Sequence, residues 1–174
     1  MSLRLLIFAF LNLYSSLLIA ADEQFMIGVG DRILVTVYNE PDLTVRARID
    51  KSGVVNFPLL GNLSVSNKTP KQLASELEEN FLDGYLVKPL VSVLIEEYRP
   101  FYIRGEVRSP GVYPFSLELT VDQAIAISGG LKDRASRSGW HIIRGEDKTK
   151  TKLEVDKDTK VLPGDVITIK ASLF

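Results

Sequence analysis

The stretch YIRGEVRSPGVYPFSLELTVDQAIAISGGL, residues 102–131, decides the fold of the second half of the chain. Residues 102–107 alternate between apolar and polar side chains, which predicts a half-buried strand. Ser109-Pro110-Gly111 supplies a tight turn, and residues 112–115 return as a second strand. The stretch therefore begins with a predicted hairpin.

A short helix is expected to follow this hairpin. Thr120 is a good N-cap, and Gln123 three residues later completes a capping box before the apolar Ala124 and Ile125. Gly129-Gly130 should end the helix, because glycine readily takes the positive φ found at a helix C-terminus. Two strands and a capped helix in this order predict a small β-grasp unit.

The first 21 residues are typical of a signal peptide. Arg4 gives a short positive region, residues 5–19 are mostly apolar, and Ala20-Ala21 offers small residues at a cleavage site. A membrane span needs roughly 20 apolar residues, and this run is shorter and interrupted by polar side chains. We therefore expect export from the cytoplasm; a retained N-terminal anchor is the alternative.

The rest of the chain has a nearly balanced charge. Without the first 21 of its 174 residues, and so without Arg4, it keeps 20 basic and 22 acidic side chains, a formal charge of −2. Nucleic-acid binding normally needs a clustered basic surface, so we expect no nucleic-acid partner. The sequence has no cysteine. Disulfides and thiol chemistry are therefore excluded, and we expect no lipid anchor on this chain.

The first part of the mature chain predicts short strands around one helix. Strands are expected at residues 32–38, 45–49, 54–58 and 90–96, with residues 39–42 breaking the first from the second.

The helix between the last two of these strands is the best marked in the chain. Thr69 caps it, Pro70 occupies its first position, and Gln72 completes a second capping box. Asp83-Gly84 should end it. Apolar residues recur on one side of this helix at four-residue intervals: Leu73, Leu77 and Phe81.

The second part should end in a hairpin of residues 140–144 and 151–155, then a strand within residues 162–170. Gly164-Asp165 starts this last strand as Gly30-Asp31 starts the first one, which is weak evidence for a repeat. The structural turn residues that we expect to matter most are Gly30, Asp31, Gly53, Gly105, Pro110, Gly111, Gly129, Gly130, Gly164 and Asp165.

Motifs along the chain, in the order in which the family has them, resemble the polysaccharide biosynthesis/export family, the Wza-like proteins. The second half, with its G-x-V-x-x-P-G turn and A-I-x-x-S-G-G ending, is similar to the soluble-ligand-binding β-grasp (SLBB) module of that family. The other matching elements are residues 27–31, 50–61, 69–73, 89–93 and 163–167.

The resemblance implies an α+β fold in two domains. A mixed-sheet polysaccharide export N-terminal domain with one capped helix would occupy residues 22–99, after the signal peptide at residues 1–21. One SLBB β-grasp domain would occupy residues 100–174. The function implied is that of a periplasmic, non-enzymatic protein that exports capsular polysaccharide or exopolysaccharide.

The resemblance also implies partners. A homo-oligomeric ring would form or cap a conduit for the polysaccharide chain. We expect this protein to lack the lipobox cysteine and the C-terminal amphipathic pore helix of the larger members. Only a helix or a closed barrel can span a bilayer, so we expect a separate outer-membrane pore protein to complete the path. An inner-membrane polysaccharide co-polymerase would deliver the polymer, and these partners would hold the protein near the outer membrane.

A soluble periplasmic glycan-binding or regulatory module that forms no conduit is the alternative function. A ring-sized mass in solution would favour the conduit, and a monomer that binds oligosaccharide would favour the alternative.

Catalysis is not expected. His141 is the only histidine, and we expect it on the surface or on an edge strand, with no metal site and no cofactor. Glycosidases use two carboxyl groups roughly 5 to 10 Å apart, but each candidate carboxylate has a simpler role in a strand start, a turn or a helix N-terminus. These carboxylates are Asp31, Asp50, Asp122 and Asp165.

Aromatic side chains gather around the β-grasp unit, where they could pack in the core or contact sugar rings. Phe101 and Phe115 are expected in the core. Tyr113 and Trp140 lie beside polar turns and are expected on a wet surface.

Charged side chains alternate along the strand opposite Val107. They predict either a solvated strand face or a contact with a subunit or an anionic glycan. With the two aromatic residues, the candidates for glycan or subunit contact are Arg104, Glu106, Arg108, Tyr113 and Trp140.

Overall fold

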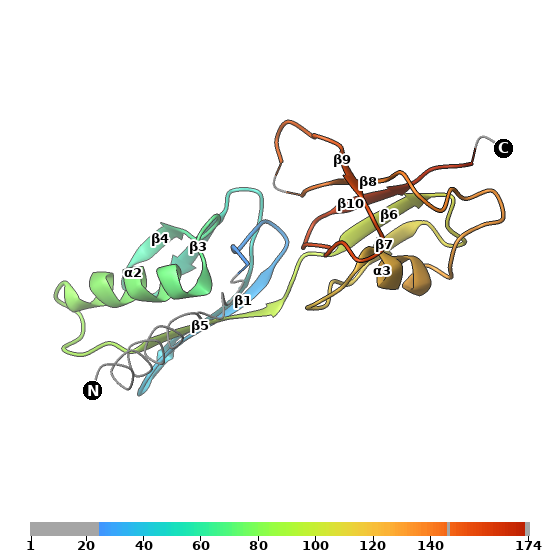
Figure 1. Cartoon of the computed structure of the whole chain (residues 1–174). Coiled ribbons are helices and arrows are strands. Elements are labelled where there is room, and N and C mark those ends of the chain that lie inside the picture. Colours follow the sequence, from blue (N-terminus) through green and yellow to red (C-terminus); the bar gives the residue numbers. More distant parts are fainter. Residues whose placement is uncertain (1–24, 146, 173–174) are drawn as a thin grey trace, which may run out of the picture.

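The computed structural model describes residues 25–145 and 147–172, so the predicted signal peptide lies outside the described residues. Within them the chain forms two units, joined by the segment between strands β5 and β6 (Figure 1). Each unit has its own hydrophobic core. Helices and sheets occur in both, so the predicted α+β class is confirmed. The domain boundary at residues 99 and 100 stays a prediction.

The first unit contains a three-stranded antiparallel sheet. Strand β1 (Arg32–Val37) lies between β2 (Glu40–Arg48) and β5 (Val91–Glu97). Apolar side chains point to the core at every second position of β1, as the alternation predicts. These buried residues are Ile33, Val35 and Val37.

Helix α2 (Pro70–Leu82) packs against β5 and closes this core (Figure 1). The predicted capping box is present. The Thr69 hydroxyl accepts from the Gln72 amide at 3.2 Å, and the Gln72 side chain accepts from the Thr69 amide at 2.9 Å. The predicted apolar stripe is fully buried, and it consists of Leu73, Leu77 and Phe81.

Strand β2 begins five residues earlier than the sequence predicts. The expected break at residues 39–42 is a tight turn at Tyr38 and Asn39, where Asn39 takes a φ of 60°. Pro41 lies inside β2, because β2 is an edge strand and a proline there need not donate to a neighbour.

Strand β4 (Gly61–Ser64) was not predicted. It pairs with the predicted strand β3 (Val54–Phe57) in a small antiparallel hairpin. Leu59 and Gly61 in the connection have φ angles of 68° and 74°. Leucine is seldom found in this region, so the turn could not be predicted from the side chain at position 59.

The second unit is built on a five-stranded mixed sheet in the order β7-β6-β10-β8-β9. The central strand β10 runs parallel to β6 and antiparallel to β8. The strands are β6 (Phe101–Gly105), β7 (Gly111–Tyr113), β8 (Trp140–Ile143), β9 (Leu153–Val155) and β10 (Val166–Ile169).

Helix α3 (Val121–Ile127) packs its buried side chains into the core of this sheet. Its N-terminal capping box joins Thr120 and Gln123, as predicted. Gly129 and Gly130 follow with φ angles of 85° and 89°. With the mixed sheet this completes the β-grasp arrangement expected from the sequence.

His141 is not on an edge strand. It belongs to β8, which lies between β10 and β9, and its side chain is half-buried. Of the two expected positions, surface or edge strand, the edge strand was wrong, because β8 pairs with β10 as well as with β9. The His141 Nε2 atom lies 3.4 Å from Lys170 Nζ.

Candidate functional site

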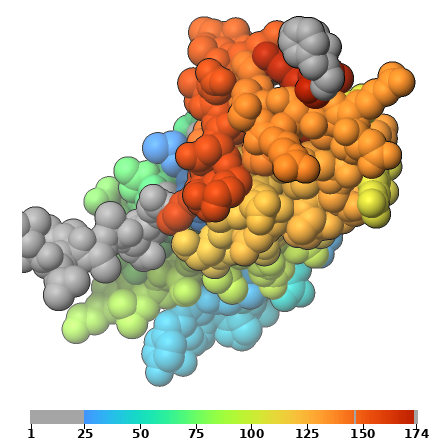
Figure 2. Space-filling view, turned by 45° about the vertical axis from the view of Figure 1, so that its right-hand side comes forward, coloured from blue at the N-terminus to red at the C-terminus, as the bar shows by residue number. Residues whose placement is uncertain are grey.

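The two units adjoin at the segment between β5 and β6 (Figures 1 and 2). The carboxylate of Asp31, buried at the start of β1, is hydrogen-bonded to this segment. The Asp31 Oδ2 atom accepts hydrogen bonds from the Gly28 amide and from Arg99 Nη1, each at 2.8 Å. Its Oδ1 atom accepts from the Arg99 amide at 2.6 Å. Asp31 therefore does more than start a strand, because it holds the residue that leads into the second unit.

A second turn of the same construction starts β10. The Asp165 Oδ2 atom accepts from the Leu162 amide at 2.8 Å and from Arg144 Nη1 at 2.5 Å. In both turns the aspartate amide donates to the carbonyl three residues earlier, at 3.1 Å. The sequence echo of Gly30-Asp31 and Gly164-Asp165 thus corresponds to the same local structure.

Arg99 connects these two turns. A Cβ atom on Gly164 would lie 3.1 Å from Arg99 Nε, and a Cβ atom on Gly30 would lie 3.2 Å from Arg99 Cβ. The Arg99 side chain is therefore packed between a glycine of each unit, with an exposed fraction of only 11 %. Glycine at both positions is required by this close approach and by positive φ angles of 99° and 84°.

Three aromatic rings reinforce the junction. Phe25, Tyr98 and Phe115 contact one another edge to face, with centroid separations of 5.4 to 5.6 Å. Phe115 is expected in the core and is partly buried there, where it also packs against the second unit's core. The other expected core aromatic, Phe101, is fully buried.

Burial dominates the electrostatics of both aspartates. Loss of water raises the pKa of Asp31 and of Asp165 above their ordinary value. Hydrogen bonds from backbone amides and from the paired arginines oppose this rise without cancelling it. Each carboxylate depends on its arginine, because an unpaired buried charge is costly.

A cleft of about 670 Å³ opens beside Arg99. Loops of the first unit carrying Lys51 and Ser66 form one side of it, and the loop of the second unit carrying Lys148 forms the other. Tyr102 of β6 also lines it and is 43 % exposed.

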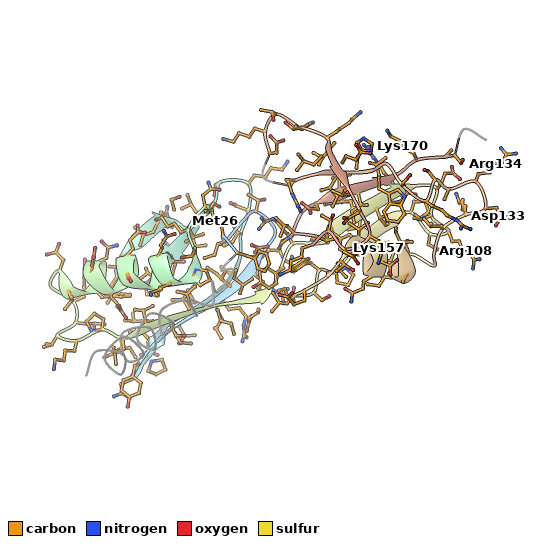
Figure 3. All side chains as sticks on the ribbon, in the orientation of Figure 1. Met26, Arg108, Asp133, Arg134, Lys157 and Lys170 are labelled. Atoms are coloured by element: carbon orange, nitrogen blue, oxygen red, sulfur yellow. The ribbon has the colours of Figure 1, made fainter. Side chains whose placement is uncertain are left out.

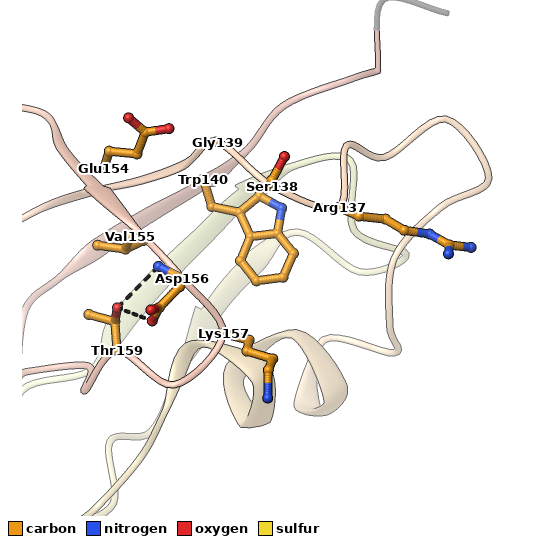
Figure 4. A pocket seen from close by; sticks show the side chains of 9 residues that line it. All are labelled: Arg137, Ser138, Gly139, Trp140, Glu154, Val155, Asp156, Lys157 and Thr159. Carbon is orange, nitrogen blue, oxygen red and sulfur yellow. Dashed lines mark hydrogen bonds between the residues drawn. The ribbon is translucent and has the colours of Figure 1, made fainter.

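A second pocket, of about 510 Å³, surrounds Trp140 (Figure 4). Arg137, Glu154 and Lys157 line this pocket together with the indole ring. Asp156 is held beside them, because its carboxylate accepts from the Thr159 hydroxyl at 2.7 Å.

The expected wet surface position of Trp140 was wrong. Its side chain is only 6 % exposed, and its indole N–H donates to the Ser136 carbonyl at 2.8 Å. The indole belongs to the second core and presents only a small part of its surface to the pocket.

Tyr113 is half-buried beside β6. Its ring stacks on Phe101 with centroids 5.9 Å apart, and its hydroxyl donates to the Ser109 carbonyl at 2.6 Å. In this position Tyr113 packs against the core and also keeps part of its side chain on the surface.

The charged strand face lies away from the junction. Arg104 is exposed and donates to the Thr168 hydroxyl at 3.0 Å. Glu106 and Arg108 line a shallow hollow with Asp133 and Arg134, at the end of the second unit far from the first (Figure 3). The structure thus divides the five predicted contact residues among three places, and their glycan or subunit contacts stay a prediction.

The described residues contain no cluster of three or more histidine or carboxylate side chains that could hold a metal ion. None of the helices in residues 25–145 and 147–172 has the length and apolar character needed to cross a membrane.

Sequence comparison agrees with this architecture. Residues 19–96 match the family model described as polysaccharide biosynthesis/export protein, and residues 100–152 match that of the SLBB domain. The chain belongs to the polysaccharide biosynthesis/export protein family. The resemblance drawn from its motifs is therefore confirmed.

Two curated relatives of this export-family protein come from bacteria. The exopolysaccharide production protein ExoF of Rhizobium meliloti (strain 1021) is 34% identical over 141 residues, covering 74% of this chain and 33% of the relative. The EPS I polysaccharide export outer membrane protein EpsA of Ralstonia nicotianae (strain ATCC BAA-1114 / GMI1000) is 24% identical over 141 residues, covering 66% of this chain and 36% of the relative. The chain spans about a third of the length of each relative.

Sequence reasoning did not find the arginine partners of the two buried aspartates of this export-family protein. Asp31 and Arg99 are 68 residues apart, and Arg144 and Asp165 are 21 residues apart. The one available signal was the repeated Gly-Asp pair, each followed by an alternating strand. An aspartate that is buried at the start of a strand needs a cation beside it. The two Gly-Asp pairs could therefore have predicted that each aspartate has an arginine partner.

Proposed function

We propose that this protein is a non-enzymatic, periplasmic component of an apparatus that exports capsular polysaccharide or exopolysaccharide. The observation that carries the proposal is the presence of an export-family domain and an SLBB domain in one chain, in that order. The packing of Arg99 against Gly164 of the second domain supports it, because it would let the two domains act as one building block. The names of both relatives, which mention exopolysaccharide or its export, are consistent with it.

The ring is part of the same proposal. Copies of the chain would pack side by side around a polar conduit, and head-to-tail contacts close into rings when the rotation permits. Exposed apolar side chains on the first unit support such packing. Tyr38, Val87 and Leu90 are 70 %, 92 % and 61 % exposed, and Tyr38 and Leu90 are neighbours because the Tyr38 amide donates to the Leu90 carbonyl at 2.9 Å.

The remaining partners follow from the proposed role. A separate outer-membrane pore protein would continue the conduit, and an inner-membrane polysaccharide co-polymerase would deliver the polymer to it. The signal peptide and association with the outer membrane through these partners belong to the same proposal.

A gene deletion tests the export role. Polysaccharide is then measured outside the cell and within the envelope. We expect less polymer outside, with polymer or its lipid-linked precursors retained inside. Restoring the gene should restore export. Normal amounts outside, in a strain without a second family member, would contradict the proposal.

Native mass spectrometry of the purified full chain tests the ring. We expect a closed oligomer, and Val87→Asp should dissociate it because the charge would be buried at the contact. Thr44→Asp, at an exposed site on β2, is the matched control. A monomer at all concentrations would contradict the homo-oligomeric ring, but it would not contradict the export role.

The Trp140 pocket favours a second function, that of a soluble glycan-binding or regulatory module. The small exposed part of the indole lies beside charged side chains in this pocket, a combination that suits a sugar ring and its hydroxyls. A monomer that binds neutral oligosaccharides, together with unchanged export in the deletion strain, would favour this alternative.

A further inference from the structure

The cleft beside Arg99 is lined by both domains and is basic. Lys51 enters it from the first unit and Lys148 from the second. Both lysines are exposed, and neither makes an ion pair within the described residues. No described residue with a carboxylate side chain lines the cleft. Arg99 lines the cleft as well, but its guanidinium forms an ion pair with Asp31.

The two lysine loops have the same construction. Lys51 stands in an Asp-Lys-Ser turn and Lys148 in an Asp-Lys-Thr turn. The Asp50 Oδ1 atom accepts from the Ser52 amide at 2.8 Å and from the Ser52 hydroxyl at 2.5 Å. The Asp147 Oδ1 atom accepts from the Thr149 amide at 2.8 Å and from the Thr149 hydroxyl at 2.5 Å.

This construction separates each aspartate from the lysine that follows it. In each turn the aspartate carboxylate accepts hydrogen bonds from its own turn, as in an Asx turn. The lysine that follows therefore does not pair with it and lines the cleft. The hydrogen bonds from Ser52 lower the pKa of Asp50, and those from Thr149 and Thr151 lower the pKa of Asp147 to about 2. Both carboxylates are therefore ionised, and accept these hydrogen bonds, at neutral pH.

The walls between the lysines offer hydrogen-bonding groups. The Ser66 Oγ atom is buried at the cleft and has no hydrogen-bond partner in the part of the chain that the structure describes. Asn67 adds an exposed side-chain amide. Tyr102 adds an aromatic ring of the kind that packs on sugars. Hydroxyl, amide and ring together suit a saccharide better than a free inorganic ion.

We propose that Lys51 and Lys148 bind, from the two domains, a negatively charged group carried by a saccharide in this cleft. The group is a carboxylate or a phosphate, because two ammonium donors at one site recognise either anion. The inference rests on the proposed export function, since it specifies the polymer as an acidic glycan.

Calorimetric titration of the purified full chain tests this site. Three probes separate the sources of binding: octagalacturonate for a carboxylate, a phosphodiester-linked oligosaccharide of similar length for a phosphate, and maltooctaose as the neutral control. We expect binding to at least one acidic probe, weakened by added salt, and at least about tenfold weaker binding of maltooctaose.

The test variant is Lys51→Gln with Lys148→Gln. We expect about threefold weaker binding for each single change and about tenfold for both, as for partly exposed ion pairs. The matched control is Lys71→Gln with Lys152→Gln, which removes one exposed lysine from each unit at sites outside the cleft. The control should bind within about twofold of the unchanged chain.

Equal losses in the test and control variants, or equal affinity for acidic and neutral probes, would overturn the proposal. The gene deletion separates this failure from failure of the export role. If deletion blocks export while the lysine variants bind normally, the cleft assignment is wrong and the export role stands. If deletion leaves export normal but the double variant loses acidic-glycan binding, the cleft assignment stands and the export role is wrong.

Discussion

The Arg99 guanidinium donates to the Asp31 carboxylate at 2.8 Å, and this contact fixes the segment that joins the two domains. The Arg99 amide holds the second oxygen of the same carboxylate at 2.6 Å. The backbone and the side chain of Arg99 therefore both donate hydrogen bonds to one buried carboxylate. These hydrogen bonds set the direction in which the chain leaves the first domain.

Replacing Arg99 by alanine should lower the free energy of unfolding by about 3 to 5 kcal/mol, because the buried Asp31 carboxylate would lose its cation. Urea denaturation followed by circular dichroism measures the change. Arg46→Ala is the control, since Arg46 is 62 % exposed in its pair with Glu96 and should cost less than about 1 kcal/mol. Similar costs for the two variants would contradict the structural role given to Arg99.

Gly105→Ala should be among the most destabilising glycine changes in the chain. Gly105 has a φ of 94°, and an added Cβ would collide with the backbone carbonyl of Ile169 on the parallel strand β10. Gly84 has a nearly identical φ of 93° but open space around it. Gly84→Ala should therefore cost only the backbone strain, about 1 to 2 kcal/mol, and Gly105→Ala at least about 2 kcal/mol more. Thermal or urea unfolding of both variants would show whether the collision adds to the strain.

The Asp147 carboxyl should titrate near pH 2, below the ordinary value of 3.8. Because its folded pKa is lowered, its contribution to stability is present above pH 3.8 and is lost as the pH falls through about 2. Carboxyl-carbon NMR measures this midpoint directly, and Thr149→Val should move it upward by removing the hydroxyl donor. A midpoint near 3.8 in the unchanged chain would contradict the turn described at this loop.

Asp165 should titrate in the opposite direction in the same experiment. Burial raises its pKa, so its contribution to stability is present below the ordinary value and is lost as the pH rises through the folded pKa. A carboxyl-carbon midpoint below 3.8 would show that the Arg144 pair outweighs burial.

Trp140→Phe should lower the free energy of unfolding by about 1 kcal/mol, because it removes the donor to the Ser136 carbonyl but keeps an aromatic ring. Trp140→Ala should cost about 3 to 5 kcal/mol, as expected for a buried aromatic side chain. Chemical denaturation separates the two. Equal small losses would place the indole on the surface after all.

Features that depend on neighbours in the chain could be predicted from the sequence. Thr69 and Thr120 cap their helices through residues three positions away, so the signals lie within one turn. The alternation that defines β1 is equally local. A strand start or a helix cap is decided by few residues, and its rules are well known.

Features that depend on distant partners could not be predicted. The Asp31–Arg99 and Asp165–Arg144 pairs form only when separate strands are assembled. The place of His141 followed from β10, which pairs with β8 from far along the chain. Leu59 shows a different limit, because its positive φ contradicts the preference of its own side chain.

Strand β10 has a consequence for how the protein is made. It is the central strand of the second sheet, yet it is the last strand of the described chain, and Val166 pairs with Tyr102 near the start of the domain. Until β10 has emerged, the growing chain can form only the separate hairpins β6–β7 and β8–β9, and isolated hairpins are marginally stable in water. During synthesis the second domain should therefore stay unfolded until its final strand is released, and then fold slowly because its key contacts are long-range.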